Sequence, residues 1–285
     1  MRKNAKPTKK EIIELEEIAK ELRVLVIDTL TEAKSGHTAG SLGMADIFSA
    51  LYFKFLNINP ENPYELDRDR LILSNGHICP ILYASLAKKD FFPLEELNTL
   101  RKINSRLQGH PHNLSLPGIE NSSGPLGQGI SIALGCSIHS TNSGYNFHTF
   151  VVGSDGELNE GQTWEAIMFA GSNKLKRLTY IIDKNNIQLS GNTIDILNLV
   201  DLKEKFESFG WYVLEIDGNN MEEICLSISK SLDIINKPVV IIANTIPGKG
   251  VDFIEYKFNW HGKAPSKEEA QRAKFYLDKN FNEKK

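Results

Sequence analysis

Two polar turns in the sequence carry residues of the kind that bind a metal ion and a phosphate group. Asp155 is followed by Gly156, and Asn185 stands thirty residues further along the chain. One carboxylate and one amide oxygen suit Mg²⁺, which takes its remaining ligands from phosphate and water. Gly156 would let a phosphate approach the backbone, and a helix beginning near Gly161 would direct N–H groups toward an anion. For either turn alone, an ordinary connection after a strand is the simpler interpretation.

Four histidines stand beside glycine or proline, in turns that could bring them to a shared site. They are His37, His77, His110 and His261. Histidine can donate a hydrogen bond to phosphate and can move protons near neutral pH. A single histidine in a loop is more often solvated. A zinc site is a competing functional interpretation, although no close spacing of His, Cys and acidic residues supports it.

The segments around these residues predict a parallel sheet covered by helices on both faces. Apolar runs at residues 147–153, 178–183, 211–217 and 238–244 are typical of buried strands, and residues 71–73 of one more short strand. Helical patterns at residues 161–172, 200–209 and 221–235 separate the later strands, as in an α/β fold. Because such sheets bind ligands beyond the carboxyl ends of their strands, Asp155 and Asn185 are predicted to meet there.

The rest of the chain is predicted to add helices and no second domain. Thr8 and Glu11 form the pattern of a capping box, and the helix that they open should end at residues 34–36. A second helix is predicted at residues 44–55. Because the sequence shows no repeat or linker, we interpret residues 1–285 as one domain, with its core at about 10–265 and a surface helix at about 266–278.

The composition is that of an ordinary globular protein. Apolar residues make up 41% and charged residues 24%, and the net charge of −3 gives no sign of a nucleic-acid-binding or membrane-surface protein. Three scattered cysteines, Cys79, Cys136 and Cys225, indicate free thiols in a reducing compartment. No apolar run would span a bilayer and no signal peptide is recognisable, so a cytoplasmic location is expected.

Taken together, the motifs resemble those of the transketolase family of thiamine diphosphate enzymes. Asp155-Gly156-Glu157-Leu158-Asn159-Glu160-Gly161 with Trp164-Glu165-Ala166, followed by Asn185-Asn186, is similar to the cofactor fingerprint of that family. Further similar segments are residues 35–42, residues 68–77, Gly109-His110-Pro111 and Gly124-Pro125-Leu126-Gly127-Gln128-Gly129. The resemblance covers about residues 20–275. It implies a three-layer, parallel-sheet fold that binds the diphosphate of the cofactor.

The resemblance also implies roles for individual residues. Asp155, Asn185 and the backbone carbonyl of Ile187 would ligate Mg²⁺, or Ca²⁺ or Mn²⁺ in its place. Thiamine diphosphate would contact His77, Gly124, Leu126, Gly156, Glu157, Asn185 and His261. The catalytic histidines would be His37, His77, His110 and His261, of which His37 and His110 would mainly face the sugar substrate. Glu160 and Glu165 would lie near an interface between subunits.

Two positions depart from the family pattern. Ser154 stands directly before Asp155, where the family usually has glycine. His112 stands where the family often has an acidic residue. These departures leave room for an altered loop and an atypical substrate.

The implied activity is transfer of a two-carbon ketol unit from a ketose phosphate to an aldose phosphate. The sequence ends near where the first family domain should end, so the pyrimidine-binding domain is expected on a separate C-terminal subunit, in an α2β2 assembly. One alternative is another thiamine diphosphate enzyme subunit, either a ketol transferase for an unusual sugar or an E1-like dehydrogenase subunit. The other is a non-catalytic binding module that kept the fold.

Overall fold

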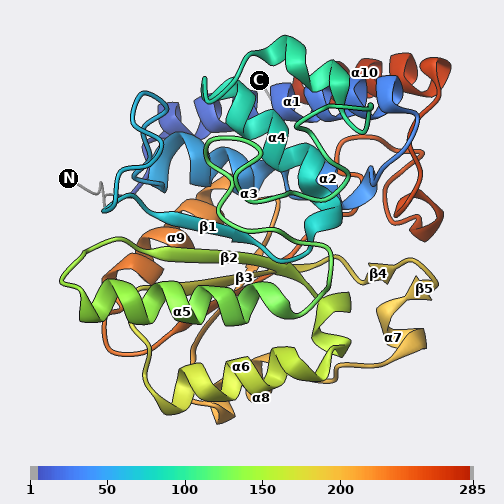
Figure 1. The fold of residues 1–285 in the computed structure, drawn as a ribbon. Helices are drawn as coiled ribbons and strands as arrows, with labels where there is room; N and C mark the ends of the chain where they lie inside the picture. Colours follow the sequence, from blue (N-terminus) through green and yellow to red (C-terminus); the bar gives the residue numbers. More distant parts are fainter. Residues whose placement is uncertain (1–5, 283–285) are drawn as a thin grey trace.

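The computed structural model describes residues 6–282 and contains a five-stranded parallel sheet with helices on both faces (Figure 1). The strands lie side by side in the order β1 (Arg70–Leu73), β2 (Thr149–Ser154), β3 (Leu178–Lys184), β7 (Val239–Asn244) and β6 (Tyr212–Asp217). Every neighbouring pair is parallel. Each strand lies within two residues of its predicted bounds, so the predicted α/β fold class is confirmed.

Both faces of the sheet are apolar, which explains why its strands are continuous hydrophobic runs in the sequence. Successive side chains of a strand point to opposite faces. Phe150 and Val152 therefore pack into one core, whereas Val151 between them packs into the other. A sheet with two buried faces needs a helical layer on each side.

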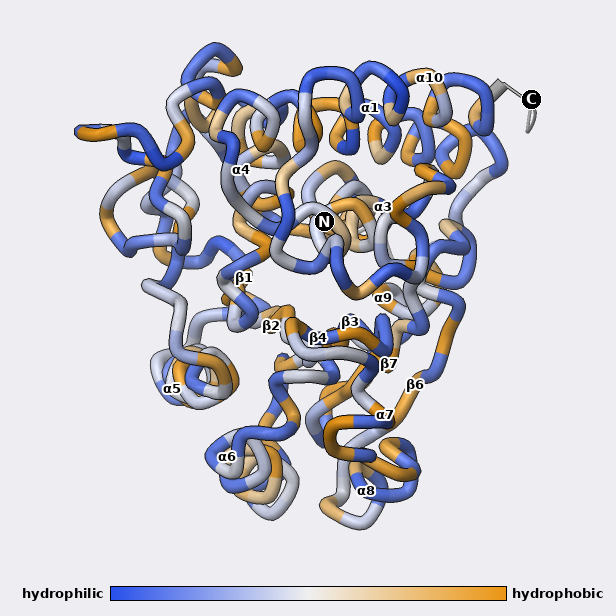
Figure 2. The backbone as a smooth tube through the Cα atoms, turned by 90° about the vertical axis from the view of Figure 1, so that its right-hand side faces the viewer, coloured by the Kyte–Doolittle hydropathy of each residue, from blue (hydrophilic) through white to orange (hydrophobic). Residues whose placement is uncertain are grey.

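The two helical layers are seen above and below the sheet in Figure 1 and again, from the side, in Figure 2. One layer contains α1 (Lys9–Ala33), α2 (Ala39–Gly43), α3 (Ala45–Ala50), α4 (Cys79–Lys88), α9 (Met221–Asp233) and α10 (Lys267–Asn282). The other contains α5 (Gln128–Asn142), α6 (Gly161–Ser172) and α8 (Leu202–Ser208). Short 3-10 turns at Gly76–Ile78, Leu94–Thr99, Gly156–Asn159 and Phe258–Trp260 lie in the connections.

The first helix begins and ends where its sequence predicts. The Glu11 N–H donates to the Thr8 hydroxyl over 3.2 Å, and the Thr8 N–H donates to the Glu11 carboxylate over 2.8 Å. After the helix, Lys34 adopts a left-handed conformation with φ of 54°, and its N–H donates to the Leu30 carbonyl. Both ends of α1 are therefore capped.

Several elements differ from the prediction. The helix expected at residues 44–55 starts earlier, is broken at Met44 between α2 and α3, and ends in a π-helical turn at Leu51–Phe55. The last helix extends to Asn282, beyond about residue 278. Helix α4, the hairpin of β4 (Ile187–Gln188) and β5 (Gly191–Asn192), and α7 (Thr193–Ile196) were not predicted.

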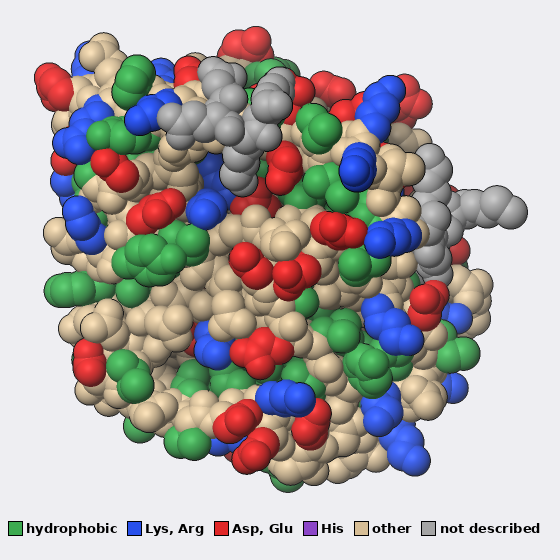
Figure 3. Space-filling view, turned by 180° about the vertical axis from the view of Figure 1, so that it is seen from behind, with side chains coloured by type: hydrophobic (Ala, Val, Ile, Leu, Met, Phe, Trp, Pro, Cys, Tyr) green, Lys and Arg blue, Asp and Glu red, His purple; other side chains and the backbone are tan. Residues whose placement is uncertain are grey.

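The interpretation of residues 1–285 as one domain stays a prediction, and residues 1–5 and 283–285 lie outside the described part of the chain. Within residues 6–282, no helix is both long and apolar enough to cross a bilayer. On the face seen in Figure 3, acidic and basic side chains are interspersed rather than gathered by sign.

Candidate cofactor site

The turns that contain Asp155 and Asn185 meet at the carboxyl edge of the sheet. Strands β2 and β3 are neighbours, and their register pairs Ser154 with Asp183. The Asp155 N–H donates to the Asp183 carbonyl over 3.1 Å. The Asn186 N–H donates to the Asp155 carboxylate over 2.8 Å. Two segments thirty residues apart in the sequence are thus joined directly.

The Asp155 carboxylate is only 2% exposed and is held by neutral donors. It accepts hydrogen bonds from the N–H groups of Gly156 and Asn186 and, over 3.3 Å, from the Thr193 hydroxyl. Burial is the main cause that raises the pKa of Asp155 to about 6. A buried carboxylate with neutral partners is costly to ionise, and a divalent cation would supply the opposite charge that these partners lack.

The side chain of Asn185 is fixed beside this carboxylate. Its Oδ1 accepts the Ile187 N–H over 3.0 Å, and its Nδ2 donates to the Asp183 carboxylate over 2.8 Å. These contacts set the orientation of the amide, so Oδ1 and Nδ2 are not interchangeable. Ile187 is 4% exposed and begins β4, which places its backbone beside the same turn.

Asp183 was not predicted as a site residue. It is 1% exposed, and burial is the main cause that raises its pKa to about 7. The Thr245 hydroxyl donates to one carboxylate oxygen and Asn185 to the other. A carboxylate at the end of an otherwise apolar strand was the available signal, because such a group stays buried only when it has partners.

Three of the four predicted histidines form one cluster. The ring centroids of His37 and His77 are 4.9 Å apart, those of His77 and His261 5.0 Å, and those of His37 and His261 5.5 Å. The three residues come from the segment before α2, the turn after β1 and the turn after Phe258–Trp260. Only the fold brings together residues so distant in the sequence.

The environment of the cluster keeps its imidazoles neutral at neutral pH. Burial is the first cause that lowers the pKa of His37, to about 4, and the positive potentials of His261, Arg101 and His110 follow. Burial likewise lowers the pKa of His77 and of His261. The Nδ1 atoms of His37 and His261 are buried and have no hydrogen-bond partner. They are therefore free to bind a polar ligand.

His110 lies beside the glycine-rich loop and near the other histidines. Its ring is 3.8 Å from where a Cβ on Gly124 would stand, and Gly124 has a φ of +149° that favours glycine. Burial, followed by Arg101, lowers the pKa of His110. Leu126, in the same loop, is partly exposed, and its carbonyl accepts a hydrogen bond from Gln162 over 2.8 Å.

Glu157 is joined by hydrogen bonds to the glycine-rich loop and to the end of β1. Its side chain is fully buried, at 0% exposure. Its carboxylate accepts the Gly127 N–H over 2.6 Å and the Ser74 hydroxyl. Both hydrogen bonds go to one carboxylate oxygen, whereas the other, Oε2, is buried without a hydrogen-bond partner. The contact of Glu157 with the cofactor stays a prediction. The Ser154 hydroxyl accepts the Glu157 N–H over 3.3 Å, so the departure at this position fits the turn.

Two residues beside the predicted site, neither of them predicted, have buried polar atoms without a hydrogen-bond partner. They are Asn75, with both polar atoms of its side chain, and Ser123, with its hydroxyl, and such atoms also occur elsewhere, as at Tyr52 and Thr149. A Cβ on Gly76 would stand 2.2 Å from the Ser123 hydroxyl oxygen, so the turn before His77 touches the segment that leads to Gly124. Unsatisfied buried groups are rare unless a ligand completes them. These residues fit a bound polar cofactor.

The candidate metal ligands are oxygen atoms of mixed origin. Among residues 6–282, no group of three or more His, Cys, Asp or Glu side chains could hold a metal ion. Asp155, Asn185 and the Ile187 backbone would instead offer one carboxylate, one amide oxygen and one carbonyl. Such a set suits Mg²⁺ that shares its shell with phosphate.

Comparison with known proteins identifies the family of the chain. A family model described as "Transketolase, thiamine diphosphate binding domain" matches residues 15–284. A 6-deoxy-6-sulfo-D-fructose transketolase subunit of Clostridium sp. (strain MSTE9) is 39% identical, over 94% of this chain and 97% of its own length. An apulose-4-phosphate transketolase subunit of Phocaeicola vulgatus is 36% identical, over 88% of this chain and 89% of its own length.

Longer transketolases match over part of their length. The transketolase of Buchnera aphidicola is 42% identical, over 82% of this chain and 37% of its own length. The crystal structure of Campylobacter jejuni transketolase superimposes with a TM-score of 0.86 and 34% identity, over 93% of this chain and 42% of that one. The chain therefore belongs to the transketolase family and corresponds to its N-terminal, thiamine diphosphate-binding part.

Proposed function

We propose that this chain is the N-terminal subunit of a split transketolase. With a separate C-terminal subunit that carries the pyrimidine-binding domain, it transfers a two-carbon ketol unit from a ketose phosphate to an aldose phosphate. The observation that carries the proposal is the meeting of the Asp155 and Asn185 turns at the same sheet edge. The relatives matched nearly end to end support the division into subunits, because they are themselves named as subunits.

The residues of the sheet edge would hold the cofactor and its metal ion. Thiamine diphosphate supplies the carbanion chemistry when bound, whereas the protein supplies binding and orientation. In this proposal Mg²⁺, or Ca²⁺ or Mn²⁺ in its place, is held by Asp155, Asn185 and the Ile187 carbonyl. The diphosphate lies along Gly156, His77 and His261. The aminopyrimidine lies along Gly124 and Leu126.

The remaining histidines would act on the sugar. A neutral imidazole can donate a hydrogen bond to a hydroxyl group and accept a proton from another, and the lowered pKa of His37 keeps it neutral. We propose that His37 and His110 orient the sugar and move protons at its oxygen atoms. General acid–base catalysis of this kind contributes about 10²–10⁴-fold to a rate.

The partner subunit would cover an exposed apolar surface on α5 and α6. Met168 and Phe169 of α6 are 51% and 47% exposed, and Ile132 of α5 is 39% exposed. Glu160 and Glu165 are exposed at the same helix. Large exposed apolar side chains among polar ones are typical of protein interfaces. The proposed assembly is α2β2, in the cytoplasm.

An assay with and without the partner subunit tests the proposal. The chain is mixed with thiamine diphosphate, Mg²⁺ and a ketose phosphate donor with an aldose phosphate acceptor. We expect ketol transfer only when both chains are present. Robust turnover by this chain alone would contradict the split active site. Failure of both chains together to bind thiamine diphosphate would favour a non-catalytic module with the same fold.

A ketol transferase for an unusual sugar is the second candidate. It is favoured by the relatives, whose names specify 6-deoxy-6-sulfo-D-fructose and apulose 4-phosphate. His112, at a position that departs from the family pattern, has an exposed side chain near His110 in the sequence. Assaying pentose phosphates, modified ketoses and 2-oxo acids with the partner present separates an ordinary transketolase, this candidate and an E1-like dehydrogenase subunit.

A further inference from the structure

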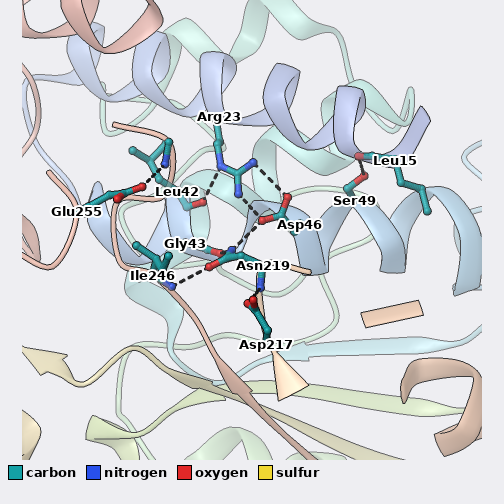
Figure 4. A network of polar contacts seen from close by, with 11 residues as sticks. Leu15, Arg23, Leu42, Gly43, Asp46, Ser49, Asp217, Asn219, Ile246 and Glu255 are labelled. Carbon is teal, nitrogen blue, oxygen red and sulfur yellow. Dashed lines mark hydrogen bonds and ion pairs between the residues drawn. The ribbon is translucent and has the colours of Figure 1, made fainter. Parts of the chain in front are cut away.

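Asn219 stands where two of the histidine-bearing segments approach each other, although it lies outside the cofactor site. It lies two residues after the end of β6, in a turn in which its N–H donates to the Asp217 carboxylate over 2.8 Å. Figure 4 shows its side chain between the end of α2 and the segment that follows β7. The cavity of about 330 Å³ that Asn219 borders is lined by none of the four histidines. Any effect of Asn219 on them is therefore indirect.

Every hydrogen-bonding group of the Asn219 amide is used. Its Nδ2 donates to the Gly43 carbonyl over 2.9 Å and to the Asp46 carboxylate over 2.8 Å. Its Oδ1 accepts the Ile246 N–H over 2.8 Å. No other neutral side chain of this size offers two donors and an acceptor in one plane. The amide thus joins α2, α3 and the segment after β7 in a single connection.

The other side of this connection is anchored to α1. Arg23 donates two hydrogen bonds to Asp46, and the Arg23 Nε donates to the Leu42 carbonyl over 3.1 Å. Arg23 and Asp46 are 7% and 6% exposed. A buried bidentate pair of this kind has a fixed geometry. Asp46 is therefore held in place by Arg23 as an acceptor for Asn219, and Figure 4 shows both contacts.

The two segments that Asn219 joins lead to His37 and His261. Helix α2 begins two residues after His37, and the segment that starts at Ile246 continues to His261. The segments also touch elsewhere, because the Gly248 N–H donates to the Ala39 carbonyl over 2.8 Å and the Thr38 hydroxyl donates to the Lys263 carbonyl over 2.5 Å. Their approach is close, since a Cβ on Gly43 would stand 2.9 Å from the Ile246 carbonyl oxygen.

We propose that Asn219 is a positioning residue that sets the spacing of the His37 and His261 imidazoles. The role rests on the proposed function in one respect: the two imidazoles must be held apart to bind cofactor and sugar. Without the amide, the Gly43 carbonyl and the Ile246 N–H would lose their common partner. The two segments could then slide past each other while the sheet beneath them stays intact.

Asn219→Asp tests this role with little change of shape. The new carboxylate can still accept the Ile246 N–H. It cannot donate to the Gly43 carbonyl or to Asp46, and it places a negative charge against Asp46. Asn220→Asp is the matched control, because it adds the same charge one residue away. The Asn220 side chain caps α9 by accepting the N–H groups of Glu222 and Glu223, and aspartate accepts from the same two groups. The change removes only the exposed hydrogen bond of 3.0 Å from the Asn220 Nδ2 to the Glu223 carboxylate.

Two readouts are taken on the full-length chain. Titration calorimetry gives the affinity for thiamine diphosphate with Mg²⁺, and NMR of isotope-labelled histidine gives the imidazole resonances without ligand. We expect N219D to weaken binding at least tenfold and to shift the resonances of His37 and His261 but not those of His139. N220D should stay within twofold of the unchanged chain. An N219D protein that matches N220D in both readouts would overturn the proposal.

Further variants keep the test decisive. If N219D does not fold, Asn219→Ser, which removes the amide without adding charge, is read in the same way. Asn219→Ala, which removes the whole amide and leaves the Arg23–Asp46 pair unchanged, should weaken binding as Asn219→Ser does, and normal affinity in both would count against the proposal. If the unchanged chain binds no thiamine diphosphate even with its partner subunit present, the proposed function fails. The histidine resonances, which need no ligand, still decide the role of Asn219.

Discussion

At the scale of single residues, burial is the main reason why the imidazoles of the histidine cluster are neutral. The first cause that lowers the pKa of His37, to about 4, is desolvation, and His261, Arg101 and His110 add positive potential. An imidazole in this setting remains neutral well below pH 7. A neutral imidazole can both donate and accept, which is what a proton-transferring residue at a sugar oxygen needs.

Replacing His37 should flatten the dependence of stability on pH. The folded pKa of about 4 lies below the ordinary value of 6.5, so the unfolded chain binds the proton more tightly. The stability linked to His37 is complete above pH 6.5 and is lost as the pH falls toward 4. Between pH 7 and pH 5, the free energy of unfolding should fall in both proteins. Allowing for solvent screening, we expect the fall to be about 1 kcal/mol smaller in His37→Gln than in the unchanged chain. Urea unfolding at both pH values measures this, and parallel losses in the two proteins would contradict it.

Glu157 should be needed for its hydrogen-bond acceptor more than for its charge. Glu157→Gln keeps an oxygen that can accept from Gly127 and Ser74, whereas Glu157→Leu leaves both donors unpaired in the interior. The unpaired groups should cost about 1–3 kcal/mol of the free energy of unfolding. In the leucine variant, the affinity for thiamine diphosphate should fall together with the free energy of unfolding. In the glutamine variant, the affinity should stay close to normal. Equal behaviour of the two variants in urea unfolding and calorimetry would refute this account of Glu157.

The sequence allowed some site residues to be predicted and not others, for a physical reason. Asp155 and Asn185 were recognisable because polar residues at strand ends of a parallel sheet must meet at one edge. Asp183 and Asn75 were not predicted. The position of Asp183 at the end of an apolar strand was a signal in the sequence, but Asn75 is distinguished only by its burial, which a local sequence does not show. The role predicted for Glu157 stays a prediction, because the direction of its side chain depends on a tertiary contact, the hydrogen bond from the Gly127 N–H.

At the scale of elements, the strands were predictable because a sheet buried on both faces leaves continuous apolar runs. The break between α2 and α3 was not, because its cause is tertiary. Gly43 ends α2, and the Ile246 carbonyl oxygen lies 2.9 Å from where a Cβ on Gly43 would stand. At the same place Asn219 donates to the Gly43 carbonyl and accepts the Ile246 N–H. The β4–β5 hairpin is too short for a periodic pattern. It is held beside the site through the Asn186 and Thr193 contacts to Asp155.

Two glycines in neighbouring helices should respond to alanine in opposite ways. A Cβ on Gly171 in α6 would stand 1.8 Å from the Phe209 carbonyl oxygen, beyond the end of α8. Gly135 in α5 has nothing within 4 Å of its Cβ position. We expect Gly171→Ala to cost about 2 kcal/mol or more through overpacking, and Gly135→Ala to stabilise by about 0.5–1 kcal/mol through helix propensity. Urea unfolding measures both, and a Gly171→Ala protein as stable as Gly135→Ala would show that α6 and α8 are not packed this closely.

At the scale of the whole molecule, the exposed apolar residues of α6 offer a surface that a partner could cover. We expect Met168→Glu and Phe169→Glu each to weaken binding of the partner subunit by tenfold or more, because both would bury a charge in the interface. Phe275→Glu on α10, where the phenyl ring is 65% exposed, is the matched control and should leave association unchanged. Co-purification and analytical ultracentrifugation measure the effect. Equal association of all three variants would place the interface elsewhere.

The central claim is that Asp155 and Asn185 together hold the metal ion that anchors the cofactor diphosphate. Calorimetric titration of thiamine diphosphate into the chain together with its partner subunit, with and without Mg²⁺, tests it most directly. Asp155→Ala should abolish the binding that depends on Mg²⁺. Asp195→Ala should bind as the unchanged chain does, because the Asp195 carboxylate is exposed and accepts only from Asn192 among the hydrogen bonds described. Unchanged affinity in the Asp155→Ala protein would contradict the claim.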